Sequence, residues 1–334
     1  MKLTVNPVLA RELKERMRGL WAFVAMMVFL GLLTLTVWVV YEANQATSGF
    51  GFELERQTRL GRDLFEWVLS IMLVLVLFFV PGLTAGAVAG ERERQTLLPL
   101  QITLLRPRHI LWGKVMASLA YLTLLVVAST PILAVAYRLG GVTIIDALVG
   151  LASILAVGVL LATMVVGISA YAKRVQSATL IAYGFTLVLS LASFIAYGIV
   201  LVIDDNRGVD PTNAPAVLLL ANPIVFLADA TAGQNIDVGQ SPLVPARQLL
   251  RDAYADNDGW WIGQSQLDDG FVFGAPDVFV EGGGFGGDGF GGDGVGLDPP
   301  VPGWALSLAS MAALAAALFW LGCRRLRTPA ETER

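Results

Sequence analysis

The stretch Ala147–Ala172, ALVGLASILAVGVLLATMVVGISAYA, contains no charged residue over 26 positions. An α-helix needs about 20 apolar residues to cross the hydrocarbon layer of a bilayer. A helix also satisfies every backbone polar group within its own segment, which the hydrocarbon requires because it offers no water as a partner. This stretch therefore predicts a transmembrane helix.

Five further charge-free runs are long enough to cross a bilayer. They are Leu20–Tyr41, Trp67–Gly90, Val115–Tyr137, Val175–Ile203 and Val301–Cys323. Over the 334 residues, 55% are hydrophobic and 15% are charged, whereas an average soluble domain has about 25% charged residues. We expect an all-α integral membrane protein with six transmembrane helices, in which Pro81 and Pro131 kink the second and third spans without ending them.

Basic residues are distributed unevenly over the segments outside these runs. Of the 23 Lys and Arg residues, 16 lie in the segments 1–19, 91–114, 173–174 and 324–334. The other seven lie in 42–66, 138–146 and 204–300. Because Lys and Arg near span ends mark the cytoplasmic side, both termini are expected inside and the segment 204–300 outside.

Residues 1–19 predict an amphipathic helix that lies in the inner membrane interface. Asn6 and Pro7 suit the first positions of a helix. Apolar residues then recur on one helical face, namely Leu9, Leu13, Met17 and Leu20, and basic residues fill much of the remainder. The alternative is a charged cytoplasmic flank that only sets the topology. Residues 324–334 are expected to form a cytoplasmic tail.

The outer segment 204–300 has three parts. Ala214–Ala228 is apolar but too short to span and is interrupted by Asn222-Pro223, so it predicts a re-entrant or interfacial element. Residues 229–281 are acidic and mixed, and their aromatic residues suit a small external subdomain or the headgroup layer. Gly282–Gly296 predicts a flexible linker, because its two imperfect Gly-Gly-Asp-Gly units are too few to stack as calcium-binding repeats.

Several kinds of chemistry have no residues to support them. The sequence has no G-x-x-x-x-G-K-[ST] phosphate loop, so we expect no ATP hydrolysis by that route in this chain. One histidine, His109, and one cysteine, Cys323, exclude a Cys/His zinc cluster and an internal disulfide. We therefore expect no enzyme activity, no cofactor and no metal in this chain, and no nucleic acid among its partners.

The six runs contain no Asp, Glu, Lys, Arg or His. Ion pumps and ion-coupled carriers need such groups at membrane depth, so an ion-coupled secondary carrier is disfavoured. The polar residues of the runs are mainly Ser and Thr, which we expect to bond to the backbone of their own or a neighbouring helix. A hydroxyl-lined apolar interior suits a hydrophobic or amphiphilic cargo.

The segment between the second and third runs, Gly90–Lys114, reads GERERQTLLPLQITLLRPRHILWGK. Its alternating charges and apolar residues predict short helices along the cytoplasmic surface. Charged side chains at its start can form charge-assisted bonds with a polar partner, namely Glu91, Arg92, Glu93 and Arg94. A solvated loop that only sets the topology is the alternative.

The same residues resemble the corresponding loop of ABC type-2 permeases, the type V exporter fold. That loop runs roughly E-x-E-x-G-T-L-x-x-L-x-x-T-P-x-x-x-x-x-I-x-x-G-K. The residues that match it without a gap are Glu91, Glu93, Thr96, Leu97, Leu100, Thr103, Ile110, Gly113 and Lys114. Gln95 stands in place of the glycine and Leu104 in place of the proline. The six spans, the inward termini and the N-terminal helix agree with the family plan.

The resemblance implies the permease subunit of an ATP-driven exporter in a bacterial inner membrane. In the family, this loop carries a coupling helix that docks on a separate cytoplasmic ATPase, which binds ATP and Mg. Two permease chains, identical or related, join two ATPase chains among the membrane lipids. Carried over here, Glu91–Leu98 is the expected coupling helix and Asn6–Arg18 the bracing helix.

The ATPase-coupling residues implied in this way are Glu91, Arg92, Glu93, Arg94, Thr96, Leu97, Thr103, Gly113 and Lys114. Charge reversal at Glu91 and Glu93 is then expected to abolish coupling while leaving folding intact. An alternative function is a non-transporting scaffold or mechanotransmitter, which couples a cytoplasmic ATPase to periplasmic partners through residues 204–300.

Overall fold

The computed structural model describes residues 20–46, 53–95, 107–206, 219–232, 242–248 and 303–326. Several predicted parts lie outside these residues, namely the helix Asn6–Arg18, the linker Gly282–Gly296, most of 229–281 and most of the tail 324–334. Within the described ranges every regular element is helical.

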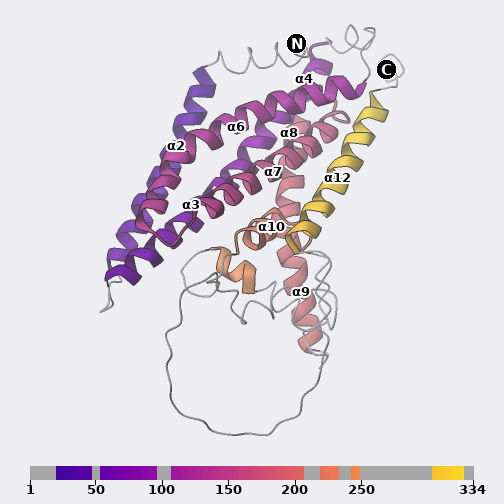
Figure 1. Ribbon diagram of the computed structural model, residues 1–334. Coiled ribbons are helices and arrows are strands. Elements are labelled where there is room, and N and C mark those ends of the chain that lie inside the picture. The colour runs from indigo at the N-terminus through magenta and orange to yellow at the C-terminus, as the bar shows by residue number, and fades with distance from the viewer. Residues whose placement is uncertain are drawn as a thin grey trace.

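Six helical spans are long and apolar enough to cross a membrane, which confirms the predicted all-α fold. Their elements are α2 (Leu20–Ala46), α3 (Glu53–Thr84) with α4 (Gly86–Glu93), α6 (Pro107–Leu139), α7 (Ile144–Ser169), α8 (Val175–Leu187) with η1 (Val188–Ala192) and α9 (Ser193–Asn206), and α12 (Gly303–Arg325). The spans run in alternating directions (Figure 1), so α4, the first turn of α6 and the last turn of α12 share one end. We call it the basic end, since it carries Arg92, Arg108, Lys114, Arg174 and Arg324.

The helices differ from the charge-free runs mainly at their ends. Helix α3 begins at Glu53, whereas the charge-free run begins at Trp67, and helix α6 begins at Pro107, whereas the run begins at Val115. A helix continues past its first ionisable residue into the membrane interface, whereas a charge-free run by definition stops there. Pro81 and Pro131 both lie inside helices, as predicted.

Helix α7 is central and packs against α3, α6, α8, α10 and α12. Its closest neighbour is α12, because Gly167 brings the two backbones together. A Cβ atom on Gly167 would lie 2.5 Å from the carbonyl oxygen of Leu318, and one on Gly322 would lie 3.1 Å from the Gly167 Cα. Small residues at a crossing of this kind are typical of helix packing in membranes.

The turn between α6 and α7 needs glycine at two positions. Gly140 and Gly141 have φ values of 94° and 77°, a region that side-chain-bearing residues rarely adopt. Thr143 then caps α7: its hydroxyl accepts from the Asp146 N–H, and the Asp146 carboxylate accepts from the Thr143 N–H. This capping box starts α7 at Ile144.

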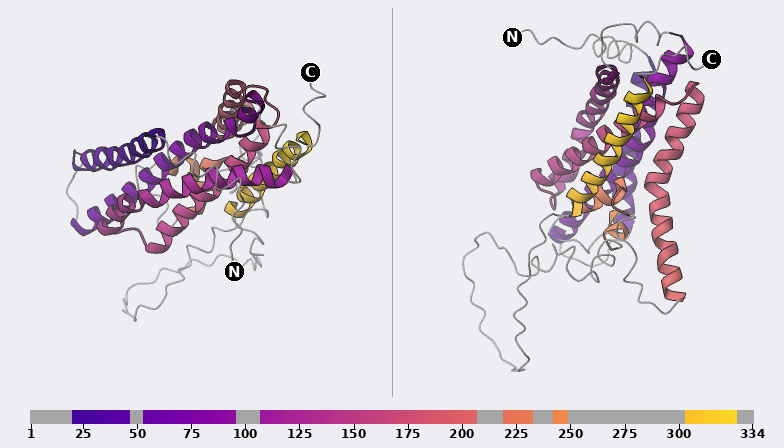
Figure 2. Two further views of the ribbon diagram at one scale, coloured as in Figure 1. Left: turned by 90° about the horizontal axis from the view of Figure 1, so that it is seen from above. Right: turned by 90° about the vertical axis from the view of Figure 1, so that its right-hand side faces the viewer.

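Helices α8, η1 and α9 follow one another without interruption along the edge of the bundle (Figure 2). Helix α10 (Pro223–Ala230) packs against η1, α7 and α12. The buried Asn222 fixes this contact, because its amide donates to the Ser190 carbonyl at 2.9 Å and to the Ser193 hydroxyl at 2.7 Å.

The sequence predicts an interruption at Asn222-Pro223, and in the structure the turn 219–221 ends there and helix α10 begins. Asn222 is the N-cap of α10, where its side-chain oxygen accepts from the Ile224 N–H, and Pro223 is the first helical residue. The dipeptide therefore begins a helix. Residues 214–218 of the predicted re-entrant element lie outside the described ranges.

The hydroxyl groups inside the spans bond as expected. Donation to the carbonyl four residues earlier occurs at Thr34, Thr36, Thr84, Ser118, Thr123, Thr163, Ser190 and Ser193. Ser129 donates to the carbonyl three residues earlier, and Ser169 donates to a neighbouring helix.

Candidate functional site at the basic end

Helix α4 continues the second span after a short break at Ala85. The buried hydroxyl of Ser169, the last residue of α7, lies in this break. It accepts from the N–H groups of Val88 and Ala89, each at 3.1 Å, and donates to the Ala85 carbonyl. One side chain thus satisfies backbone groups that the break leaves without helical partners, and it fixes α4 to α7.

The last turn of α4 is joined to α6 by an ion pair. The Lys114 Nζ atom lies 2.8 Å from Glu91 Oε1, and the Lys114 side chain is only 1% exposed while that of Glu91 is 23% exposed. A buried ammonium group is stable only when it is paired and hydrogen-bonded. Glu91 therefore holds the charge of Lys114 inside the bundle.

Two neighbouring side chains join α4 to the connection between α7 and α8. The Arg92 guanidinium donates to the Ala172 carbonyl at 2.9 Å, and Glu93 accepts from the Val175 N–H at 3.0 Å. Val175 is the first residue of α8, so Glu93 places a carboxylate at a helix N-terminus, where negative charge is favourable.

Helix α4 ends at Glu93, and Arg94 is its C-cap. Gln95 follows with a φ of 58°, and its N–H donates to the Arg92 carbonyl at 3.1 Å. A left-handed residue after a helix end is most often glycine. The family loop has glycine at this position, and the φ of Gln95 supplies a physical reason for that glycine.

The structure brings together only some of the predicted coupling residues. Glu91, Arg92 and Glu93 lie in α4, and Gly113 and Lys114 lie in the second turn of α6. Thr96, Leu97 and Thr103 lie outside the described residues.

Two expectations need correction. A continuous helix Glu91–Leu98 is not present, because α4 starts at Gly86 and the chain leaves helical geometry at Gln95. Charge reversal at Glu91 and Glu93 cannot leave folding intact either, because Glu91 pairs with the buried Lys114 and Glu93 bonds to Val175. Lysine at position 91 would place two ammonium groups together in a buried site.

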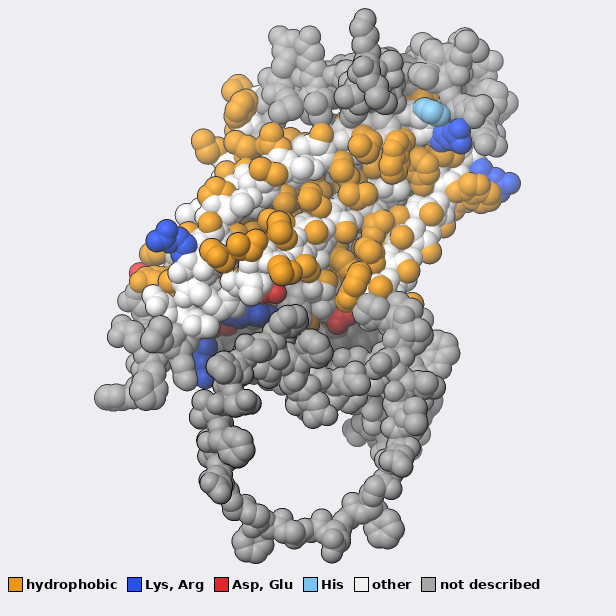
Figure 3. All heavy atoms as spheres, in the orientation of Figure 1, with side chains coloured by type: hydrophobic (Ala, Val, Ile, Leu, Met, Phe, Trp, Pro, Cys, Tyr) orange, Lys and Arg blue, Asp and Glu red, His pale blue; other side chains and the backbone are white. Residues whose placement is uncertain are grey.

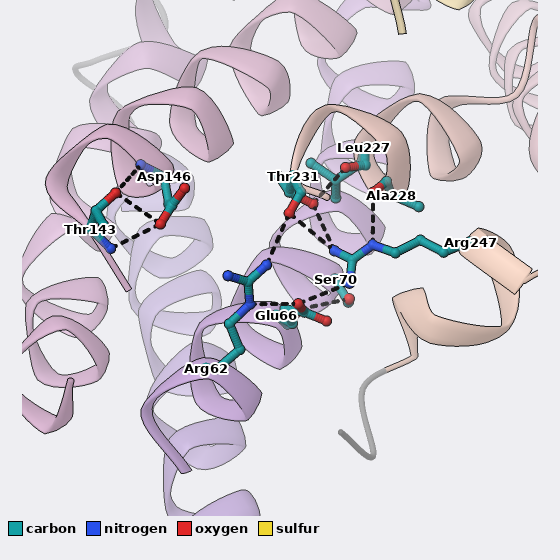
Figure 4. A network of polar contacts seen from close by, with 9 residues as sticks. All are labelled: Arg62, Glu66, Ser70, Thr143, Asp146, Leu227, Ala228, Thr231 and Arg247. Carbon is teal, nitrogen blue, oxygen red and sulfur yellow. Dashed lines mark hydrogen bonds and ion pairs between the residues drawn. The ribbon is translucent and has the colours of Figure 1, made fainter. Parts of the chain in front are cut away.

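The opposite end contains a second polar cluster, which the sequence analysis missed (Figure 4). Arg247, in the helical stretch 243–248, lies 2.9 Å from Glu66 of α3, and both side chains are 4% exposed. Its guanidinium also donates to the Ala228 carbonyl and to the backbone and hydroxyl oxygens of Thr231, at 2.9 to 3.3 Å. Arg62 adds a second ion pair to Glu66 at 3.1 Å. We call these residues the Glu66–Arg247 network.

The network fixes the end of α10 and the stretch 243–248 to α3. It escaped prediction because Glu66 lies just before a charge-free run, and its partner is 181 positions away. Beside it, burial raises the pKa of the Asp229 carboxyl, whereas the Trp304 N–H and the Arg247 charge lower it. Asp229 thereby joins α10 to the first turn of α12.

The comparisons with known proteins agree with this architecture. A family model described as ABC-2 family transporter protein matches residues 44–324, from the end of α2 to the end of α12. No curated protein matches the sequence. The match covers far more than half of the 334 residues, and the chain therefore belongs to the ABC-2 transporter family, as the permease, or membrane-spanning, component of an ABC transporter.

Proposed function

We propose that this chain moves a hydrophobic or amphiphilic cargo out of the cytoplasm, or out of the inner leaflet of a bacterial inner membrane. ATP is bound with Mg and hydrolysed by a separate ATPase subunit at the basic end. Two permease chains, identical or related, form the pathway. The Lys and Arg distribution supports placing the basic end in the cytoplasm.

The bonding of α4 is the observation that carries the coupling part of the proposal. Helix α4 is bonded to α7 through Ser169 in its first turn, and to α6 through Lys114 and to α8 through Val175 in its last turn. The adjoining segment 96–106 holds four more of the matched loop residues, namely Thr96, Leu97, Leu100 and Thr103. A displacement of this segment by an ATPase would therefore act on four spans together. In this proposal Glu91, Arg92 and Glu93 position the docking segment instead of contacting the ATPase themselves.

The test is ATP turnover with the chain alone and in complex with its ATPase. We expect no hydrolysis by the isolated chain, and hydrolysis by the complex that an amphiphilic cargo stimulates in liposomes. Uptake of a fluorescent amphiphile into inverted vesicles should follow turnover. Hydrolysis by the isolated chain, or a complex whose turnover never responds to the permease, would refute the proposal.

One observation favours the alternative of force transmission to periplasmic partners. The second span carries α4 at the basic end and the Glu66–Arg247 network at the opposite end, so one span connects the coupling site to the outer segment. A mechanotransmitter would show ATP turnover that responds to a periplasmic partner and moves no amphiphile. The vesicle measurement separates the two functions.

A further inference from the structure

A pocket of about 380 Å³ opens at the basic end and is lined by Arg108, His109, Trp112 and Phe319. The first three belong to the first turns of α6, and Phe319 belongs to α12. Trp112 and Phe319 meet edge to face, with ring centroids 6.0 Å apart. The volume is in the range of small-ligand sites, about 300–1,000 Å³.

Two arginine–tryptophan pairs lie on the helices that form the pocket. On α6, Arg108 precedes Trp112 by one turn; on α12, Arg324 follows Trp320 by one turn, with its guanidinium 4.1 Å from the Trp320 ring centroid. Because the two helices run in opposite directions, the arginine is nearer the end of the bundle in both pairs. This order, with the charge outside and the aromatic ring one turn deeper, suits a membrane interface.

The charge and the apolar surface around the pocket both suit an anionic amphiphile. The described residues that line the pocket include no Asp or Glu, and the sequence from 96 to 114 contains three Lys or Arg residues, one His and no acidic residue. Deeper in the membrane, Met116 continues the exposed face of Arg108 and Trp112. On the face shown in Figure 3, a histidine and basic side chains gather at the upper end, above a broad apolar surface.

We propose that this pocket binds an anionic phospholipid of the cytoplasmic leaflet. Arg108 binds the phosphate, and Arg324 at the same end of α12 adds to the positive charge near it. The headgroup lies beside His109, and an acyl chain lies along Trp112 and Met116. Each arginine near an anionic headgroup contributes about fivefold to affinity, so the pair contributes on the order of 25-fold. The site uses none of the residues that bond α4 to the bundle.

Titration of the full chain in mild detergent with phosphatidylglycerol, followed by native mass spectrometry, tests this site. Phosphatidylcholine serves as the uncharged comparison. We expect tighter binding of phosphatidylglycerol, and an affinity reduced about 25-fold in Arg108→Gln/Arg324→Gln. The matched control is Arg59→Gln/Arg138→Gln, which removes the same charge from exposed positions at the opposite end and should bind as the wild type does.

Phosphatidylglycerol with a brominated acyl chain locates the lipid, since bromine quenches nearby tryptophan fluorescence. We expect part of the quenching to disappear in Trp112→Phe. Equal losses of affinity in both double variants would show that only net charge matters and would overturn the proposal. Equal quenching in Trp112→Phe and in the wild type would also overturn it. If a second copy of the chain covers the pocket instead, a cysteine at His109 in a Cys323→Ser background will cross-link between chains, and neither variant will alter lipid binding.

Discussion

Replacing Arg247 by Met removes the centre of the Glu66–Arg247 network while retaining a side chain of similar length. The guanidinium and the Glu66 carboxylate are both 4% exposed and 2.9 Å apart. The substitution leaves Glu66 with a buried charge compensated by Arg62, and it deprives the carbonyl groups of Ala228 and Thr231 of a donor.

The size of the effect follows from burial. Removing one partner of a buried ion pair costs about 3–5 kcal/mol of unfolding free energy when the other charge is left uncompensated. Because Arg62 still pairs with Glu66, we expect Arg247→Met to cost about 3 kcal/mol, the lower end of that range. Removing both partners costs less than the sum of the two single losses. We expect Glu66→Leu/Arg247→Met to lose about 2–3 kcal/mol less than that sum, near the upper limit for contacting residues.

Equilibrium unfolding in detergent, followed by circular dichroism, measures these differences. Arg138→Met is the matched control, because Arg138 is exposed at the same end of the bundle and its loss should change stability by less than about 0.5 kcal/mol. An Arg247→Met variant as stable as this control would refute the reasoning. A double variant whose loss of unfolding free energy equals the sum of the losses of Glu66→Leu and Arg247→Met would also refute it.

Three further predictions use the same unfolding measurement. Gln95→Gly should stabilise the chain by about 0.5–1 kcal/mol, because glycine adopts a φ of 58° without strain. Gln57→Gly inside α3 should destabilise the chain by about 1 kcal/mol. If both variants raise the unfolding free energy, or both lower it, this prediction is contradicted. Gly167→Ala should lower the unfolding free energy by about 1–3 kcal/mol because its Cβ would contact the backbone of α12. Gly184→Ala, with open space around it, should raise it by about 0.5–1 kcal/mol. An unchanged stability of Gly167→Ala would show that α7 and α12 can move apart at little cost in free energy. Burial raises the folded-state pKa of Asp229 above its ordinary 3.8, so stability should fall as pH rises through that value towards the raised pKa. Asp229→Asn, which can still accept from Trp304, should be more stable than wild type at pH 7, and the difference should shrink near pH 4; a difference that is independent of pH would exclude this cause.

The six spans could be predicted because each is a local property of the sequence. A long run without charge has few structural solutions in a bilayer, and the hydroxyl groups within it have backbone carbonyls one turn away. Pro81 and Pro131 stay inside their helices for the same reason, since the surrounding apolar residues determine the span.

The packing of helix α10 depends on residues that are distant in the sequence, so the local sequence does not predict it. Asn222-Pro223 interrupts the apolar run Ala214–Ala228, and like Asn6-Pro7 it offers the N-cap and first residue of a helix. In the structure Asn222 caps α10 and bonds to η1, a contact between segments 32 positions apart. The sequence therefore predicts the interruption, but not the helix that begins there or its contact with η1.

For the charged residues of the basic end, the sequence alone does not show which partners the side chains bind. Alternating Glu and Arg in Glu91–Arg94 indicated a surface available to a partner. Three of these side chains instead bond to α6 and to the α7–α8 connection. Their partners are 23 to 82 positions away, so only the folded arrangement distinguishes an internal ion pair from a docking charge.

Site-specific photo-crosslinking from the segment 96–106 tests the central claim most directly. A photoreactive amino acid at Thr96, Leu97 or Thr103 in the full chain should capture a protein that carries the G-x-x-x-x-G-K-[ST] loop and hydrolyses ATP. The same group at Arg138, exposed at the opposite end, should not capture that protein. Capture of the ATPase from Arg138, or from none of the three loop positions in an assembled and active complex, would contradict coupling through this segment.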